Sequence, residues 1–438
     1  MKRQLKLVLG NRKLMFQIFF TLFIITIVCL GTFWPLPFIN TKSLDLSKLF
    51  AVFSINAGTL FGLGITPYIT ASMVVQFLQP LLPICREWKD QGQMGKRKLN
   101  LFTRSLGLLF AFGQSFAFLN SYSKLFVTSI STSQLFLLAL IATAGVAILI
   151  WFADLINSKG IGNGTSILIV VSMSHSLINL FVNLNESYLS QNNFLTLKTF
   201  NFACIVLLLL LFLIFTVVVQ ITSLKIPINF ARNQVQGKSY IPFKINSAGV
   251  MPVILASALL QPFQLLAGVI GNTKFTELVD FFAKTNFPED QINFFAIGFL
   301  VLLVIVFSFF SAFMNVIPED ISEHLSKQDA NIAGLRPGEQ TTRYLANTLF
   351  KITVLGSVFI AALVVTPILM EHFLGLKDLK LGGTSLLFIV RVALGTIHRI
   401  KATASKKEYQ KLFYLREPRQ YDTNILGPPG LVKALKGL

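Results

Sequence analysis

Few residues in this chain have the types and spacing needed to do chemistry on a substrate. The four histidines are scattered without the short spacings of a metal site: His175, His324, His372 and His398. The glycine cluster Gly160-Ile161-Gly162-Asn163-Gly164 lacks the Walker lysine and the strand-turn-helix context of a phosphate-binding loop, so we interpret it as a tight turn. The sequence therefore predicts a protein that is not an enzyme and that uses no metal and no cofactor.

The carboxylates argue against a carrier for small solutes. Ion- or proton-coupled transporters commonly place Asp or Glu near the middle of membrane spans. Here Asp154 and Glu371 lie at the ends of apolar segments, and the other acidic residues are in loops or tails. An inverted-repeat secondary transporter stays open as a remote alternative, because backbone carbonyls and hydroxyls can also bind sodium.

A repeated set of small, polar and proline residues is the most informative pattern. The motif G-x-x-P-x-I-x-A-S-x-x-x-Q-x-x-Q begins at Gly64 and again at Gly249. Similar interrupted apolar segments at corresponding places in two halves indicate the functional site of an inverted-repeat membrane protein. We expect Pro67 to start a helix with Thr66 as its cap, and Pro252 to kink a longer helix.

The elements that carry these copies are predicted to be membrane helices. Hydrophobic residues make up 53% of the 438 residues and charged residues 13%, and the mean hydropathy is +0.67. This composition is typical of an all-α polytopic membrane protein. We predict ten spans, five in each of two inverted halves: 15–36, 64–83, 104–122, 133–153, 163–184, 200–222, 247–270, 294–316, 346–370 and 382–402.

Basic residues predict the orientation and the division of the chain. Of the 38 Lys and Arg, 28 fall on the side that holds both termini and eight on the other, which places both termini in the cytoplasm. We divide the chain into an N-terminal half, 1–199, a C-terminal half, 200–402, and a basic tail, 403–438. The net charge of +19 suits orientation, anionic lipids and a cytosolic partner.

The stretch before the first copy, residues 54–63, is too short to span and rich in small residues. We interpret it as a re-entrant element, which is tolerated where it is buried in protein or lines a water-filled cavity. An ordinary extracellular loop is the alternative.

Five segments in order resemble the SecY family, the channel subunits of the bacterial and plastid protein translocase. They are Gly64 to Ser72, Gly92 to Lys98, Gly160 to Gly164, Pro318-Glu319-Asp320 with Leu335-Arg336-Pro337-Gly338, and Gly382 to Leu387. The resemblance covers nearly the whole chain. It implies a pore between the two halves that passes unfolded preproteins and releases membrane helices sideways into lipid.

The resemblance also assigns residues to the parts of that channel. It implies an apolar ring at the pore waist, and these ring positions are Ile65, Ile69, Thr165, Ile169, Ile254 and Phe388. It implies a plug in residues 54–63, with Ser54, Asn56, Gly58, Thr59 and Gly62 as its small and polar members. It implies a lateral gate between the second and seventh spans, and we expect hydrogen bonds across it from the gate positions Thr70, Ser72, Gln76, Asn246, Ser247 and Gln261.

The implied partners are proteins and lipids. Loops 223–245 and 317–345 correspond to those that dock a SecA-type motor ATPase or the ribosome, through the docking cations Lys225, Arg232, Lys238, Arg336 and Arg343. Small membrane subunits like SecE and SecG, preproteins with signal sequences and anionic lipids complete the set, and no sequence-specific nucleic acid is expected. The implied location is the bacterial plasma membrane or the plastid thylakoid membrane.

Some positions depart from the family pattern. Thr165 and Phe388 replace the usual aliphatic residues, Gly395 replaces an acidic one, and Arg391 stands inside the last span where small or apolar residues are usual. A charge in a span is costly unless it faces water or a partner, so we expect Arg391 to line the cytoplasmic funnel. These differences leave an accessory channel, dedicated to a few substrates, as an alternative to the general one.

Overall fold

The computed structural model describes residues 12–32, 34–37, 59–121, 131–174, 197–230, 239–249, 251–270, 273–283, 293–336, 338–374 and 388–403. Its N-terminal helices are α2 (Arg12–Gly31), α4 (Thr66–Leu81), α5 (Pro83–Asp90), α6 (Gly92–Ser121) and α7 (Thr132–Lys159). A short helix, Gly164–Ser174, follows them. The remaining helices are α9 (Leu197–Ile221), α10 (Met251–Ile270), α11 (Thr273–Ala283), α12 (Phe294–Asn315), α13 (Pro318–Lys327) and α14 (Glu339–Leu374), with a last helix at 388–403.

Each of the ten predicted spans contains helix. Within the described residues, five helical segments are long and apolar enough to cross a membrane: Arg12–Gly31, Gly92–Asn120, Thr132–Lys159, Phe294–Lys327 and Glu339–Met370. Their outer faces carry many exposed large apolar side chains, such as Phe19, Leu109 and Leu355, which only a lipid environment stabilises. The chain is a multi-pass membrane protein, and the count of ten crossings stays a prediction.

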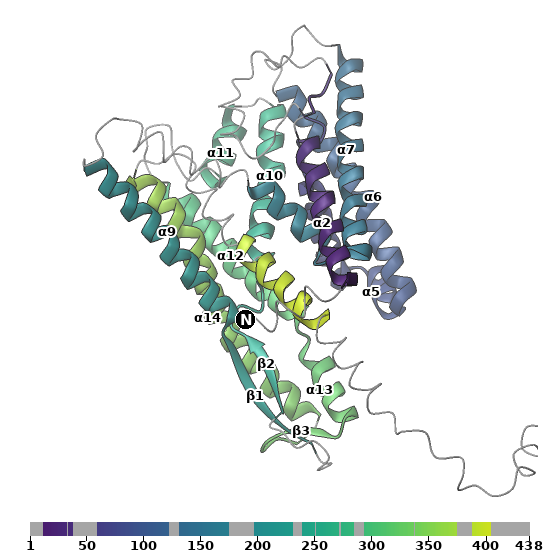
Figure 1. Ribbon diagram of the computed structural model, residues 1–438, viewed down its shortest axis with the longest axis vertical. Coiled ribbons are helices and arrows are strands. Elements are labelled where there is room, and N and C mark those ends of the chain that lie inside the picture. The colour runs from purple at the N-terminus through teal and green to yellow at the C-terminus, as the bar shows by residue number, and fades with distance from the viewer. Residues whose placement is uncertain are drawn as a thin grey trace, which may run out of the picture.

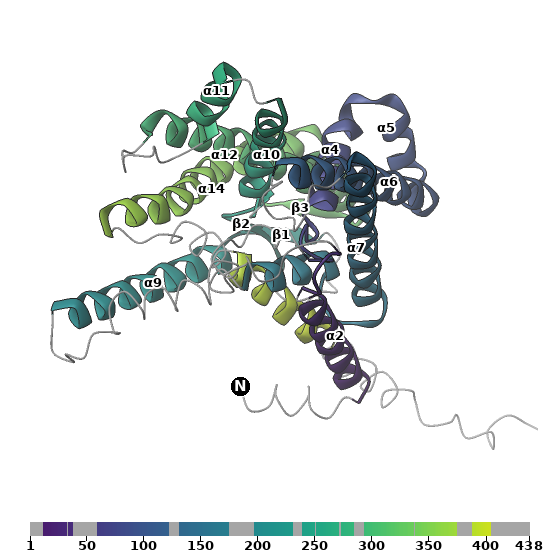
Figure 2. The ribbon, with the colours of Figure 1, turned by 90° about the horizontal axis from the view of Figure 1, so that it is seen from above.

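The helices form two groups, as Figures 1 and 2 show. Helices α2, α4 and α7 share a core that includes Ile24, Leu149 and Leu168, and α6 packs against α4 and α7. Helices α10, α12 and α14 share a second core that includes Val304 and Ile360. The last helix, yellow in both views, lies beside α2 (Figures 1 and 2), and its Val392 packs against the first core.

The two copies of the repeat begin their helices in the same way. Gly64 has a φ of 59° and Gly249 a φ of 73°, the left-handed region that favours glycine. Helix α4 begins two residues after Gly64, and α10 begins two residues after Gly249. The predicted kink at Pro252 is therefore wrong: Pro252, like Pro67, lies in the first helical turn, where its missing N–H costs nothing.

The predicted cap at Thr66 is also wrong. Thr66 is the first residue of α4, Ile65 precedes it, and no side chain caps the helix. The alanines of the two copies, Ala71 and Ala256, are both 0% exposed. The motif therefore encodes a close-packed helix start rather than a polar one.

A small sheet was not expected from the sequence. Strands β1 (Ser223–Phe230), β2 (Ser239–Lys244) and β3 (Ala330–Ile332) form an antiparallel sheet in the order β2-β1-β3, which joins the two predicted cytoplasmic loops. Alternate residues of β1, such as Ile226, face a core shared with α13 and α14. The period of two in Leu224-Lys225-Ile226-Pro227-Ile228 was the signal for this strand.

Candidate functional site

Three isoleucines connect the apolar cores of the two helix groups. Ile69 of α4 packs against both cores, and Ile254 of α10 packs against the second core and against the small cluster of Leu363 and Phe388. Ile169, from the helix Gly164–Ser174, packs against the first core and against the same small cluster. All three are half-buried. Residues far apart in the chain therefore meet at one apolar junction between the groups.

The other ring positions divide into buried and polar members. Ile65 is 2% exposed within the first core, and Phe388 is 4% exposed beside Leu363. Thr165 belongs to none of the apolar clusters in the described part of the chain, and its hydroxyl donates to Oδ1 of Asn163 at 2.8 Å. Five of the six predicted ring positions thus lie in apolar clusters or pack against them. The sixth, Thr165, bonds to the glycine turn instead.

The segment before α4 is held firmly where it is described. Leu60 N donates to Trp34 O, and Thr59 forms a bridge with Pro35. A Cβ on Gly145 of α7 would lie 2.1 Å from Leu60 O, so this backbone lies directly on α7. Gly62, of the predicted plug, donates its N–H to Thr59 O. The predicted plug residues Ser54, Asn56 and Gly58 lie outside the described residues.

The contact between α4 and the second helix group is apolar and aromatic. Met73 of α4 is buried with Val253 of α10. Phe77 of α4 stacks on Phe310 of α12 with ring centroids 4.2 Å apart, and it lies 5.7 Å from the ring of Phe307. Helix α10 also packs along α6. We call Met73, Phe77, Phe307 and Phe310 the seam residues. Sequence reasoning missed them because a Met or Phe in a membrane helix carries no distinguishing signal.

The predicted gate positions do not hydrogen-bond across this seam in the described residues, which corrects the expectation. Thr70 Oγ1 donates to Pro67 O at 2.8 Å, and Ser247 Oγ donates to Lys244 O at 2.7 Å. Asn246 Oδ1 accepts from Gly249 N at 2.7 Å. Hydroxyls in helices bond readily to a carbonyl one turn back, which removes them from longer-range contacts.

Two of the remaining gate positions, Ser72 and Gln76, form no hydrogen bond across the seam to a residue that the structure describes. Ser72 and Gln76 are half-buried. No hydrogen bond joins either residue to another that the structure describes. The side chain of Gln261 lies outside the described residues.

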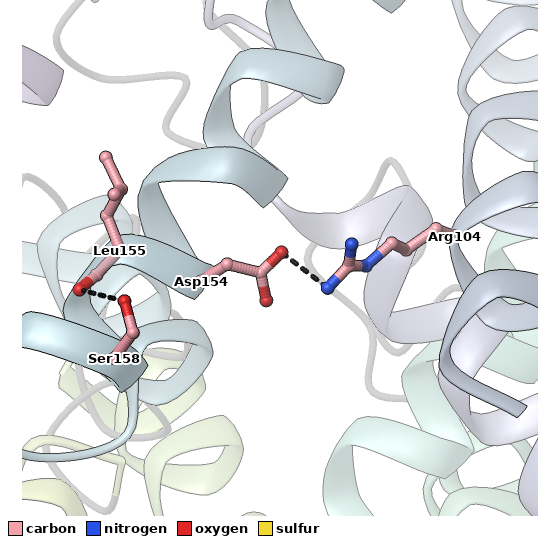
Figure 3. Close-up of polar contacts among 4 residues, drawn as sticks. All are labelled: Arg104, Asp154, Leu155 and Ser158. Atoms are coloured by element: carbon pink, nitrogen blue, oxygen red, sulfur yellow. Dashed lines mark hydrogen bonds and ion pairs between the residues drawn. The ribbon is translucent and has the colours of Figure 1, made fainter. Parts of the chain in front are cut away.

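One ion pair lies inside the first helix group. Arg104 Nη2 of α6 is 2.7 Å from Asp154 Oδ2 of α7, and Figure 3 shows the two side chains facing each other across the gap between the helices. Each side chain is 40% exposed. In the same view Ser158 Oγ donates to Leu155 O one turn further along α7. Pairing lowers the cost of both charges near the membrane, so Asp154 is a structural carboxylate rather than an ion-binding one.

The glycine cluster is a tight turn, as predicted, and three elements hold it. Gly162 has a φ of 96°, and its carbonyl accepts a 2.6 Å hydrogen bond from Nη1 of Arg399 in the last helix. Ile161 N donates to Thr21 Oγ1 of α2 at 3.0 Å. Gly164 N donates to Asn157 Oδ1 of α7 at 2.8 Å. The turn therefore joins the first helix group to the last helix of the chain.

The docking cations that the structure describes lie on and beside the sheet. Lys225 on β1 lies over the Tyr240 ring at 4.9 Å, and Arg336 and Arg343 are exposed. Arg336 lines a surface hollow of about 380 Å³ together with Asn229, Asn331, Ile332, Ala333, Gly334 and Leu335. On α13, Lys327 beside Glu323 lowers the pKa of that carboxyl. Arg232 and Lys238 lie outside the described residues.

The described residues contain no group of His, Cys, Asp and Glu side chains that could hold a metal ion. Comparison with known proteins then decides the family. The family model SecY matches residues 59–397. The chain belongs to the SecY family.

Two curated SecY-family relatives show how far the match extends. The protein translocase subunit SecY of Staphylococcus epidermidis is 33% identical over 415 residues, which cover 90% of this chain and 95% of that protein. The corresponding subunit of Staphylococcus aureus is 34% identical with the same coverage. These relatives are translocase subunits and not enzymes.

Solved structures support the SecY fold at lower identity. A protein-conducting channel aligns with a TM-score of 0.63 and 16% identity, and covers 88% of this chain and 91% of that one. The canine Sec61 in a ribosome-channel complex aligns with a TM-score of 0.61 and the same identity and coverage. The yeast Ssh1 complex bound to the 80S ribosome aligns with 0.59 and 15% identity, and covers 95% of this chain and 94% of that one.

Proposed function

We propose that this chain is the pore-forming subunit of a protein-conducting channel, which passes unfolded preproteins across a membrane. The observation that carries the proposal is the apolar junction of Ile69, Ile169 and Ile254. These side chains come from three helices in both groups, and two of them pack against the cluster of Leu363 and Phe388. An apolar constriction offers water and ions no hydrogen-bonding partner, so it closes by dewetting and can still part around an extended chain.

In this proposal residues 59–63 are the end of the plug, and the 1–199 and 200–402 halves move apart around the junction. Leu60 on Gly145 and Phe61 beside Gly31 would fix the base of the plug to the first half. Thr165, which bonds to Asn163, lies one helical turn from Ile169 and would face the cytoplasmic funnel.

The lateral gate would open between α4 and the helices α10 and α12. Met73 and Phe77 supply apolar contact there, in place of the hydrogen bonds that the sequence predicted. Contacts of this kind lose nothing when lipid replaces them, because lipid tails are as apolar as the seam itself. Such a seam could therefore open sideways to a signal sequence at low cost.

A crosslink across the seam tests both the gate and the function. In a chain whose three native cysteines are replaced, Phe77→Cys with Phe310→Cys should react with a short bifunctional reagent, because the rings are 4.2 Å apart. We expect the link to block preprotein export into vesicles that contain the assembled complex. The control pair is Phe112→Cys with Phe136→Cys, whose rings lie 5.1 Å apart within the first helix group. Normal export with the seam linked would rule out this gate.

We further propose that the sheet face around Arg336 docks a SecA-type motor or the ribosome. The exposed guanidinium beside a hollow suits two-pronged binding of a carboxylate or phosphate. Arg336→Glu should impair export at normal protein level, whereas Arg86→Glu, an exposed charge reversal on α5, should not. Equal export by the two variants would remove Arg336 from the docking surface.

The membrane, the orientation and the remaining partners belong to the same proposal. The Staphylococcus relatives and the 28 cytoplasmic Lys and Arg favour a bacterial plasma membrane with both termini inside, and small SecE-like and SecG-like subunits beside the chain. An accessory channel is the second candidate, which Thr165 and Arg391 favour. A genome that holds another, more typical SecY would support it, and a sole copy would exclude it.

A further inference from the structure

Arg391 lies one helical turn after Phe388 in the last helix and is half-buried. Ile169 and Ile254 pack against the cluster that Phe388 forms with Leu363, so this cation stands about 5 Å along the helix from the apolar junction, toward the end that holds Arg399. A charge at such a depth is costly unless it has water or a partner. The groups around the Arg391 guanidinium therefore indicate its role.

The guanidinium of Arg391 lies on the backbone at the start of the second repeat copy. A Cβ built on Gly249 would lie 2.2 Å from Cζ of Arg391, 2.3 Å from Nη1 and 2.4 Å from Nη2. The planar group thus occupies the place of the side chain that Gly249 lacks. It also lies beside the first turn of α10, where unpaired backbone N–H groups carry partial positive charge. The partial positive charge of the helix start repels a cation that has no counterion. The same position becomes favourable when an anion binds both the guanidinium and the N–H groups of the helix start.

No anion from the described part of the chain reaches Arg391. Two other arginines of the described helices have partners: Arg104 is 2.7 Å from Asp154, and Arg399 donates to Gly162 O at 2.6 Å. Arg391 forms no ion pair and no hydrogen bond with any residue that the structure describes. Its five N–H donors therefore have no acceptor among the residues that the structure describes.

A second unused donor lies on the same turn. Asn246 is 3% exposed, and its Oδ1 accepts from the N–H of Gly249. Its Nδ2 is buried and has no hydrogen-bond partner among the described residues. A buried donor without a partner is uncommon and calls for an explanation. Two sets of donors thus meet at Gly249, and neither set has an acceptor among the described residues.

We propose that Arg391, supported by Asn246, is a transient binding site for the carboxylates of Asp and Glu side chains in the polypeptide that passes the apolar junction. The inference rests on the proposed channel function and adds a substrate chemistry to it. A planar guanidinium binds a carboxylate through two parallel hydrogen bonds. A carboxylate that approaches an apolar constriction loses hydration, and Arg391 offsets that loss one turn before the narrowest point.

The test compares reporter preproteins that differ only in a short run of Glu, Gln or Lys in the segment after the signal sequence. Export is measured into vesicles that contain the assembled complex, and the result is the ratio of the Glu rate to the Gln rate. We expect Arg391→Gln to lower this ratio about three- to tenfold, the scale of one charge-assisted hydrogen bond. Arg391→Lys should give an intermediate ratio, and the Lys reporter should gain relative to Gln.

The control is Lys401→Gln, which removes one charge from an exposed position on the same helix and should leave the ratio unchanged. An unchanged ratio in Arg391→Gln would overturn the proposal, whatever the effect on the Gln reporter alone. A wild-type ratio that falls just as far when anionic lipids are left out would also overturn it, because the occupant would then be a lipid phosphate. If Arg391→Gln does not accumulate, a wild-type ratio in Arg391→Lys, which lacks the planar fork, counts against the proposal.

The channel function is judged separately. Export of the Gln reporter by wild-type vesicles, compared with vesicles that lack the chain, does not depend on Arg391. Failure of that export would contradict the proposed channel function. Successful export with the same Glu-to-Gln ratio in Arg391→Gln as in the wild type would contradict only the carboxylate site.

Discussion

The two copies of the repeat have the same backbone and different neighbours. Gly64 and Gly249 both adopt a positive φ, and α4 and α10 each begin two residues later. A Cβ on Gly64 would meet only Ser172 Oγ at 3.6 Å, whereas a Cβ on Gly249 would meet the Arg391 guanidinium. The local sequence thus sets the helix start, while the surroundings set what each copy does.

The anchoring of the two copies differs as well. The segment before the first copy is fixed by Leu60 O on Gly145 of α7. The turn before the second copy is fixed by Ile245 O, close to Gly356 of α14, and by Ser311 Oγ of α12, which donates to Ala248 O. The backbone contact that anchors the first copy, Leu60 O on Gly145, is therefore tighter than the corresponding contact of the second copy, Ile245 O near Gly356.

Gly145→Ala should have the largest effect on stability. Its Cβ would lie 2.1 Å from Leu60 O, and a backbone carbonyl cannot move aside cheaply. We expect a loss of about 3 kcal/mol, which thermal unfolding of the detergent-solubilised complex would detect. Gly113→Ala in α6, where a Cβ meets nothing within 4 Å, is the control and should be neutral or stabilising. Equal unfolding temperatures for both variants would contradict a tight anchor.

Gly356→Ala should have a smaller effect on the second copy. Its Cβ would lie 2.6 Å from Ile245 O, a milder clash than the one at Gly145. We therefore expect a loss of stability of about 1–2 kcal/mol in the same thermal unfolding measurement. Gly298→Ala in α12, which also has open space, is its control. A loss larger than that of Gly145→Ala would reverse the proposed difference between the anchors.

Gly64→Ala and Gly249→Ala compare the two copies directly. Each should lose about 1 kcal/mol from the positive φ alone. Gly249→Ala should in addition displace the Arg391 guanidinium, a flexible group that can move, and so lower the Glu-to-Gln export ratio. In an Arg391→Gln background that extra effect should vanish. If it persists there, the link between Gly249 and Arg391 is absent.

The repeat serines should show the smallest effect. Ser257 Oγ donates to Val253 O within α10, and Ser72 has no hydrogen bond to a described residue. Ser72→Ala and Ser257→Ala should each change stability by less than about 0.5 kcal/mol. A clear loss of stability or of gate closure in Ser72→Ala would restore the hydrogen-bonded gate that the sequence predicted.

These contrasts show which features local sequence can predict. Helix positions, the turn at Gly160 to Gly164 and the apolar contacts of Ile69, Ile169 and Ile254 follow from composition, glycine spacing and the family resemblance. The sequence also carried a signal for strand β1 that was not used. Its Ile226 and Ile228 alternate with residues that are exposed in the structure.

Features that depend on which helices meet could not be read in this way. Phe77 and Phe310 are ordinary phenylalanines among 43, and only the fold stacks them. The sequence places Arg104 and Asp154 at the ends of two predicted spans, and their pairing requires α6 and α7 to lie side by side. The position of Arg391 on Gly249 depends on contact between the last helix and the start of α10.

The bond from Arg399 to Gly162 has a consequence for how the protein is made. Its two residues are 237 positions apart, so at about 5–20 residues per second the ribosome supplies Arg399 roughly 10–50 s after Gly162. During that interval the turn lacks one of the groups that hold it. A nascent chain arrested before residue 388 should therefore be degraded by membrane proteases faster than the full-length chain, and pulse-chase labelling would measure this. Contact between the last helix and the Gly162 turn would then complete the fold of the first half only after the second half has been synthesised.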